Sequence, residues 1–300
     1  MAHITHYLGI DGGGTKTEFA LADTKGNILS RMTLGPSNPN DVGLEACLSV
    51  IDEGIRAVST DIKPQNISLF AGLAGGISGN NRQLITRRLD TYGFGKYDNG
   101  SDAQNAVSAC LGHEDGVAVI MGTGAIAFAQ RQGVLYRTGG YGYLLGDEGS
   151  GFALGRDAIR AALEHEAGYG RPTLLTEAVL GKCAAPTVLD ALASFYAGGK
   201  RLIASYAPLV FDAAQQSDAV ATEILSRNMA AIAELIAAAI KIAGLECSVQ
   251  AVLCGGISHH KSTILPLISA SLPLIDAKIS LQVCGKPMVY GALRLAGAPI

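Results

Sequence analysis

The chain contains no tryptophan, few aromatic residues (6%) and few charged residues (16%). Its 23 Lys and Arg residues against 26 Asp and Glu residues give a formal net charge of −3. This balance argues against the broad positive surface that binds a nucleic-acid backbone or an anionic membrane. Because 48% of the 300 residues are hydrophobic, the chain can bury a large core, and a disordered protein is excluded. The length predicts one two-lobed protein or two domains.

Long apolar runs are also missing. The longest one, residues 229–245, contains Glu234 and Lys241 and is shorter than the roughly 20 residues that cross a bilayer. Its apolar residues recur in steps of three and four, which predicts an amphipathic helix packed on a core. No apolar block typical of a cleaved leader precedes Asp11. We therefore expect a cytoplasmic protein with no membrane partner and no nucleic-acid partner.

The six cysteines include no CxxC pair. In a reducing compartment this spacing predicts small buried thiols rather than a disulfide framework. The six histidines do not have the spacing of metal ligands either. We expect no metal site built from histidine or cysteine.

Short apolar segments separated by glycine turns open both halves of the chain. Residues 7–10, 17–22 and 28–34 predict three strands, and residues 116–121, 125–130 and 134–137 repeat the pattern. Helices and strands then follow; we expect helices in 41–59, 80–89, 263–271 and 289–296, and strands in 67–73, 96–99, 248–254 and 278–283. The repeat predicts a duplicated α/β fold with two lobes and a central cleft. We assign residues 1–112 and the helix in 287–300 to an N-terminal lobe, and 113–286 to a C-terminal lobe.

The 38 glycines gather at the ends of these predicted strands. A glycine turn either makes a tight hairpin or lets backbone amides surround phosphate oxygens. Several turns beside carboxylates favour the phosphate interpretation; they are 12–14, 75–76, 122–124, 139–140, 149–151 and 255–256. A Walker loop is excluded because Thr15, not lysine, follows Gly14. A dinucleotide fold is disfavoured because residues 122–127 run into a predicted strand instead of a helix.

Three aspartates lie beside these turns: Asp11, Asp102 and Asp147. Acidic side chains repel phosphate unless a cation intervenes, so their position implies Mg²⁺ or a proton-accepting role. Two structural alternatives stay open. Asp102 precedes a predicted helix and could cap it, and Asp147 could be a turn residue that bonds its own backbone.

These residues resemble a known family. Residues 11–15 (Asp-Gly-Gly-Gly-Thr), 122–124 (Gly-Thr-Gly) and 254–256 (Cys-Gly-Gly) are similar to the first phosphate, second phosphate and adenosine motifs of the sugar kinase/Hsp70/actin superfamily. Residues 140–142 (Gly-Tyr-Gly) and 146–150 (Gly-Asp-Glu-Gly-Ser) resemble the N-acetylglucosamine kinase branch, grouped with the BadF/BadG/BcrA/BcrD ATPases. The resemblance implies a ribonuclease H-like (actin-like ATPase) fold, with ATP and Mg²⁺ bound by the motifs.

The resemblance also implies a role for each motif residue. Asp102 would be the general base, and Asp11 would meet Mg²⁺ directly or through water. ATP would be bound by Gly12, Gly13, Gly14, Thr15, Gly122, Thr123, Gly124, Gly255 and Gly256. The amino sugar would be bound by Asn38, Asp102, Gly140, Tyr141, Gly142 and Asp147. The chain departs from the family pattern in Tyr141, where relatives often carry Trp, in Pro39 after the sugar-binding Asn, and in Ala125, where serine is common.

The expected reaction is phosphorylation of the 6-hydroxyl of N-acetylglucosamine, with glucosamine as the alternative acceptor. A BadF-type ATPase that activates a dehydratase through a shared cluster would need clustered cysteines, which the sequence lacks. ROK sugar kinases are disfavoured because no cysteine-rich zinc loop or ExGH-like element occurs. A non-catalytic sugar or nucleotide sensor would keep the glycine turns without needing Asp102. The sequence fixes neither the acceptor sugar nor the oligomeric state, and a homodimer is among the assemblies left open.

Overall fold

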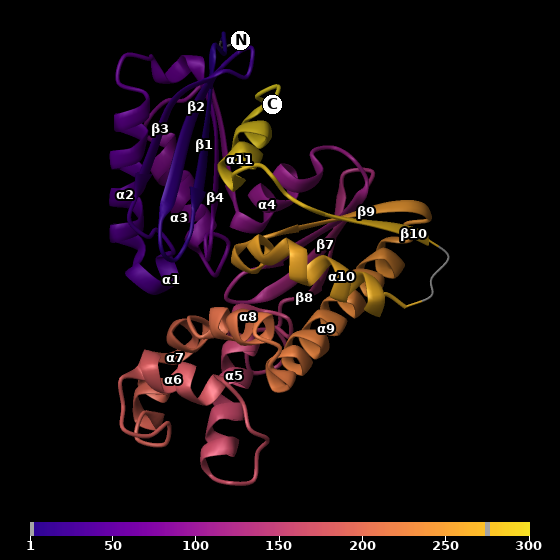
Figure 1. The fold of residues 1–300 in the computed structure, drawn as a ribbon. Helices are drawn as coiled ribbons and strands as arrows, with labels where there is room; N and C mark the ends of the chain where they lie inside the picture. Colours follow the sequence, from indigo (N-terminus) through magenta and orange to yellow (C-terminus); the bar gives the residue numbers. More distant parts are fainter. Residues whose placement is uncertain (1–2, 274–276) are drawn as a thin grey trace. The chain divides into compact units, whose positions relative to one another are not determined.

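The computed structural model describes residues 3–273 and 277–300 (Figure 1). The chain divides into two compact units. The N-terminal unit comprises Met1–His113 and Gly285–Ile300, and the C-terminal unit comprises Glu114–Cys284. Each unit is built on a five-stranded sheet with helices against it.

The sheet of the N-terminal unit has the order β3-β2-β1-β4-β5. Its strands are β1 (His6–Gly12), β2 (Thr17–Asp23), β3 (Ile28–Leu34), β4 (Ile67–Leu73) and β5 (Lys96–Gly100). The first three form an antiparallel meander, and β4 and β5 continue from β1 in parallel. The helices are α1 (Pro39–Val42), α2 (Leu44–Val58), the 3₁₀ turn η1 (Pro64–Asn66), α3 (Asn81–Asp90), α4 (Asp102–Leu111) and α11 (Met288–Ala296).

Two glycines allow α11, from the far end of the chain, to pack closely in this unit. A Cβ on Gly9 of β1 would lie 2.7 Å from the backbone nitrogen of Leu293. A Cβ on Gly291 would lie 1.8 Å from the backbone oxygen of Asn105 in α4. The buried side chains of Val289 and Leu293 then pack on Ala20 and Ala22 of β2. The C-terminal helix therefore belongs to the core of the N-terminal unit (Figure 1).

The sheet of the C-terminal unit repeats this topology with the order β8-β7-β6-β9-β10. Its strands are β6 (Gly116–Met121), β7 (Ala125–Arg131), β8 (Val134–Gly139), β9 (Cys247–Cys254) and β10 (Ala277–Val283). Here too the first three strands are antiparallel, and β9 and β10 continue from β6 in parallel. The helices are α5 (Gly151–Glu166), α6 (Leu175–Cys183), α7 (Leu192–Ala204), α8 (Ala207–Gln215), α9 (Ala219–Ala243), the 3₁₀ turn η2 (Gly256–His260) and α10 (Lys261–Ser271).

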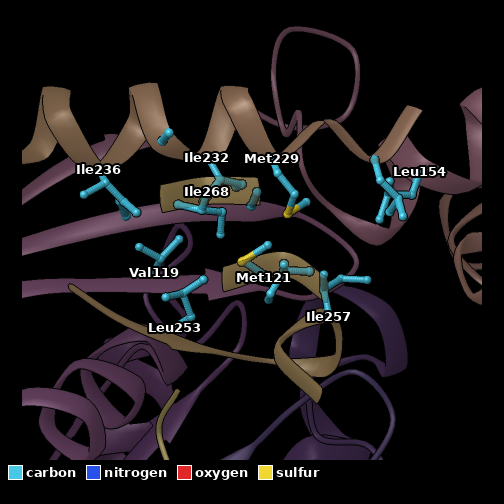
Figure 2. Close-up of a cluster of buried hydrophobic side chains, with 14 of the residues drawn as sticks. Val119, Met121, Leu154, Met229, Ile232, Ile236, Leu253, Ile257 and Ile268 are labelled. Carbon is cyan, nitrogen blue, oxygen red and sulfur yellow. The ribbon is translucent and has the colours of Figure 1, made fainter. Parts of the chain in front are cut away.

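Helix α9 provides much of the core of the C-terminal unit, as its apolar spacing predicts. Figure 2 shows Met229, Ile232 and Ile236 of this helix in one buried cluster with Val119 of β6 and Leu253 of β9. All of these side chains are fully buried. Asp218 starts the helix, and Gly244 ends it with a left-handed conformation (φ 63°). Among the described residues no helix is long and apolar enough to span a bilayer.

The predicted strands and most predicted helices are confirmed, with two corrections. The helix expected in 41–59 is broken at Gly43, whose φ of 83° and ψ of 156° separate α1 from α2. The expectation of buried cysteines holds for Cys47 and Cys254 but is wrong for Cys247, which is exposed at the start of β9. The spacing of the cysteines could not reveal this, because the exposure of a strand's first residue depends on whether that end of the strand lies at the surface.

Candidate active site

The first group of candidate residues lies where β1 and β4 of the N-terminal unit end. Asp11 of β1 is opposite Gly72 of β4. Asn105 of α4 donates its side-chain amide to Asp11 Oδ1 at 2.7 Å and to the backbone oxygens of Ile10 and Gly72 at 3.1 Å each. Three acceptors facing one nitrogen fix the orientation of this amide. A Cβ on Gly72 would lie 2.3 Å from Asn105, so glycine leaves the room that this buried side chain needs.

The charge of Asp11 is poorly compensated. Burial raises the pKa of Asp11 to about 7; the hydrogen bond from Asn105 acts against this shift, and the nearby charges of Asp102 and Glu18 add to it. Lys16 lowers the pKa only as the smallest contribution. The ionised form of a partly buried carboxyl is therefore unfavourable here, and a divalent cation beside it would relieve that cost.

The loop after β1 is tied to two neighbouring loops. The Gly13 amide donates to the Lys16 oxygen at 2.9 Å, and the Gly13 oxygen accepts from the Ser37 amide at 3.0 Å. The Ala74 amide donates to the Gly12 oxygen at 2.7 Å. Thr15 is exposed on this loop. Backbone hydrogen bonds of Gly12 and Gly13 thus fix the base of the glycine turn, while Thr15 stays exposed.

Asn38 is held by a cluster of amide side chains. It starts α1, accepts from the Asn40 amide at 3.1 Å and donates to Asp41 Oδ2 at 3.0 Å. Asn81 donates to both Asn40 and the Gly75 oxygen. Gly75 has a φ of 70°, and a Cβ there would lie 2.3 Å from Asn38 Oδ1. The Gly75–Gly76 turn therefore packs directly against Asn38, the residue predicted to bind the sugar.

Asp102 does not cap its helix, so that interpretation is wrong. Ser101 is the N-cap of α4 and forms a capping box with Gln104. Asp102 is the first helical residue; it is exposed and accepts from the Ala103 amide at 3.0 Å. Desolvation by the surrounding protein raises the pKa of its carboxyl, against the effect of that hydrogen bond. An exposed carboxyl with a raised pKa is suited to accept a proton.

The second group lies in the C-terminal unit, at the end of β6. The loop Gly122–Gly124 closes on itself through a 2.9 Å bond from the Gly122 amide to the Gly124 oxygen. The first amide of α5, Gly151, donates to the Gly122 oxygen at 2.8 Å. Gly255 has a φ of 93°, and a Cβ there would lie 2.6 Å from the Met121 oxygen. The structure thus brings the predicted second phosphate motif and the predicted adenosine motif together.

Asp147 follows in the same unit. It has a φ of 65°, and its side chain is 4% exposed. Its Oδ2 lies 3.1 Å from Nζ of Lys200 on α7. A Cβ on Gly124 would lie 2.8 Å from Asp147 Oδ2. Asp147 also opens a turn, in which the Ser150 amide donates to the Asp147 backbone oxygen at 3.1 Å, and its carboxylate forms an ion pair with Lys200 beside the glycine loop.

The loop that carries Asp147 is anchored at Gly149. Its amide donates to Asn228 Oδ1 at 2.9 Å, and Asn228 donates to buried Asp157 at 3.1 Å. Arg156 binds Glu148 and Asp157. A cavity of about 580 Å³ is lined in part by Glu148, Arg156, Asp157 and Asn228. Bonds to α5 and α9 thus fix the loop from behind.

The predicted Gly140–Tyr141–Gly142 segment follows β8. Gly140 and Gly142 have φ angles of 67° and 87°. Tyr141 is 68% exposed, and a Cβ on Gly146 would lie 3.5 Å from its side chain. The segment therefore lies next to the loop that carries Asp147.

The sequence analysis did not identify Asn105, Lys200 and Asn228, whose side chains bind residues of the predicted motifs. Asn105 comes one helical turn after Asp102, and this spacing could have placed it on the same helix face. Lys200 follows the pair Gly198-Gly199, a signal of a helix break. Nothing near Asn228 in the sequence marks it, because its partner Gly149 is 79 residues away.

Comparisons with known proteins identify relatives over most of the chain. The chain is 33% identical over 285 residues to N-acetyl-D-glucosamine kinase of Dictyostelium discoideum, covering 89% of each chain. It is 26% identical over 300 residues to the N-acetylmuramic acid/N-acetylglucosamine kinase of Clostridium acetobutylicum, covering 97% of this chain and 98% of the relative. A candidate N-acetylglucosamine kinase from Chromobacterium violaceum has the same fold, with a TM-score of 0.78, 24% identity and coverage of 98% and 99%.

A family model also matches most of the chain. The match extends over residues 8–271 and includes the glycine loops, Asp102 and the Asp147 loop. On this match and on the identity to the Dictyostelium relative, the chain belongs to the BadF/BadG/BcrA/BcrD ATPase family.

Proposed function

We propose that the chain is an ATP-dependent kinase that phosphorylates the 6-hydroxyl of N-acetylglucosamine. The observation that carries the proposal is Asp102, an exposed carboxyl with a raised pKa that is not used to cap its own helix. Its charge contributes to raising the pKa of Asp11, which lies near the end of β1. The similarity to amino-sugar kinases over most of the chain supports the choice of acceptor.

The residues around Asp11 fit a magnesium ion that arrives with ATP. Among the described residues no group of three or more His, Cys, Asp and Glu could hold a metal ion. Mg²⁺ usually needs only one or two carboxylates, because phosphate oxygens and waters supply its other ligands. Burial raises the pKa of Asp11 to about 7, so a bound cation would stabilise the ionised form of this carboxyl. When bound, Mg²⁺ would neutralise charge that develops on the phosphates.

Each motif has a role in this proposal. The glycine turns 12–14 and 122–124, with Thr15 and Thr123, bind the phosphates, and Gly255 with Gly256 packs on the nucleoside. Asn38, Asp147 and the segment 140–142 bind the hydroxyl and amide groups of the sugar. Asp102 accepts the proton of the 6-hydroxyl while the oxygen of that hydroxyl attacks the γ-phosphorus. The bond between the γ-phosphorus and the bridging oxygen breaks, and ADP leaves.

The proposal includes a cytoplasmic location, where ATP is available, and leaves the homodimer as a prediction. Light scattering coupled to gel filtration would measure the assembly. Neither property enters the chemical argument above.

A coupled ADP-release assay tests the function. N-acetylglucosamine, glucosamine, N-acetylmannosamine and glucose should be compared at equal concentration, and N-acetylglucosamine should give the highest kcat/KM. The matched control is 6-deoxy-N-acetylglucosamine, which lacks only the acceptor oxygen and should give no sugar-dependent ADP release. Carbon NMR of the product should show phosphate on C6. Sugar binding without sugar-dependent ADP release would instead favour a sensor.

A further inference from the structure

Lys200 lies beside the glycine loop of the C-terminal unit. Its Nζ would be 3.2 Å from a Cβ on Gly124, and it lies 3.1 Å from Asp147 Oδ2. The Lys200 side chain keeps 33% of its surface exposed, whereas that of Asp147 keeps 4%. The Asp147 side chain is thus enclosed, while the Lys200 side chain keeps about a third of its surface exposed.

The backbone before Lys200 is built for this position. Gly199 interrupts α7 with a φ of 57° and a ψ of −155°, a conformation that only glycine adopts readily. Helix α7 packs on α5, whose first amides bind the Gly122–Gly124 loop. Tyr143 also covers Lys200, with its ring centre 5.8 Å from Nζ. The break therefore sets the lysine between the Asp147 loop and the glycine loop.

The charges at this point explain why a cation is needed. Asp147 alone would repel a phosphate bound at Gly124, because like charges at close range oppose each other. Lys200 cancels the charge of Asp147 and still has donors to spare, since an ammonium group carries three. A lysine ammonium is a compact charge that binds phosphate well.

We propose that Lys200 is a phosphate-binding residue, held beside the Gly122–Gly124 loop by Asp147 and donating to a phosphate group of the bound nucleotide. The inference rests on the proposed function, because it takes the loop as a phosphate site. It assigns the compensating positive charge of the C-terminal unit to one side chain.

The test compares ligands with and without phosphates. The affinity for the non-hydrolysable ATP analogue AMPPNP with Mg²⁺ should fall roughly 10- to 100-fold in Lys200→Met, as expected for loss of a hydrogen bond between charged groups. The affinity for adenosine, measured by NMR titration, should not change. Lys200→Arg should retain more AMPPNP affinity than Lys200→Met. Equal loss for both ligands, or unchanged AMPPNP affinity, would overturn the proposal.

A double variant separates direct contact from simple neutralisation of Asp147. In the Asp147→Asn background, adding Lys200→Met should still weaken AMPPNP binding. If the double variant binds AMPPNP as tightly as Asp147→Asn alone, Lys200 only neutralises Asp147, and the contact is refuted. This pair also serves if Lys200→Met alone fails to fold, because the double variant leaves no unpaired buried carboxylate.

Lys241→Met is the matched control, since it removes one positive charge from an exposed position on α9. Its AMPPNP affinity should equal that of the unmodified protein. The readout is also separate from kinase activity. If no sugar stimulates ADP release but AMPPNP still binds in a Lys200-dependent way, the acceptor proposal fails and the Lys200 proposal stands.

Discussion

In the N-terminal unit Asp11 accepts from a side-chain amide and is affected by the charges of two nearby acids, whereas in the C-terminal unit Asp147 contacts the ammonium group of Lys200. The two sheets have the same strand order and the same pattern of parallel and antiparallel pairs. The two units share a topology, so their difference in charge compensation comes from the side chains around Asp11 and Asp147. One unit leaves the charge of its acid poorly compensated, and the other pairs its acid with a cation.

Asp102→Asn should lower the activity more than any other variant described here. The amide cannot accept a proton, so kcat should fall by about 10²- to 10⁴-fold, the usual worth of a general base. AMPPNP affinity should stay within about twofold, because Asp102 has no proposed contact with the nucleotide. Steady-state kinetics and calorimetric titration would measure both quantities.

Asp98→Asn is the matched control for this variant. Asp98 lies on β5 in an exposed ion pair with Arg82, and pairs of that kind contribute little to stability. Its kcat should be unchanged. An Asp102→Asn enzyme with normal kcat would remove the proton acceptor from the proposed mechanism.

Asp11→Asn should change how the free energy of unfolding depends on pH. Because burial raises the pKa of Asp11 from 3.8 to about 7, the folded state binds this proton more tightly than the unfolded state. The free energy of unfolding therefore decreases as pH rises from about 4 to 7, and the penalty is complete above pH 7. Without nucleotide and Mg²⁺, Asp11→Asn should be more stable than the unmodified protein by about 2–4 kcal/mol at pH 8, and by little at pH 4.

Urea unfolding at the two pH values would measure this difference. Glu53→Gln, an exposed acid on α2, is the control and should show no such pH-dependent gain. A constant difference between pH 4 and pH 8 in Asp11→Asn would contradict an uncompensated charge.

Asn228→Ala addresses the other side of the comparison. The change leaves the buried Gly149 amide without its acceptor and removes a donor to Asp157. We expect the free energy of unfolding to fall by about 1–3 kcal/mol and KM for the sugar to rise. Ser226→Ala, a change at a half-buried position on the same helix, should affect neither. If KM is unaffected while stability falls, the anchor is structural only and does not position Asp147.

Asp218→Ala gives the smallest expected effect. Burial alone would raise the pKa of Asp218, but hydrogen bonds from the Ala221 and Leu174 amides and the Thr173 hydroxyl outweigh it and lower the pKa. Its stabilising effect is therefore present above pH 3.8 and is lost as the pH falls through the lowered pKa. The variant should lose about 1 kcal/mol at pH 7, as for other N-caps, and less at pH 2. An equal loss at both pH values would refute the charged cap.

The sequence predicts much of this fold because local patterns determine it. Alternating apolar residues and glycine turns identify β1 to β3 and β6 to β8, and helical spacing identifies α9. The break at Gly43 escapes the prediction, since apolar spacing continues through it. It depends on a backbone angle that the residue pattern does not reveal.

The candidate site is predictable only in part, for a related reason. Motif residues such as Asp11 and Gly122 lie next to strands, so their neighbourhood follows from sheet topology. Asn228 and Lys200 reach the site from helices distant in sequence, and their partners are defined only by packing. The charge balance that distinguishes the two units therefore emerges only from the structure.

Asn105 has a mechanical consequence for catalysis. It shares α4 with Asp102, three positions away, and its amide is fastened to the backbone of two adjacent strands. Along a helix, three residues correspond to a rise of about 4.5 Å. The spacing between Asp102, the proposed proton acceptor, and the end of β1 is therefore set by rigid secondary structure.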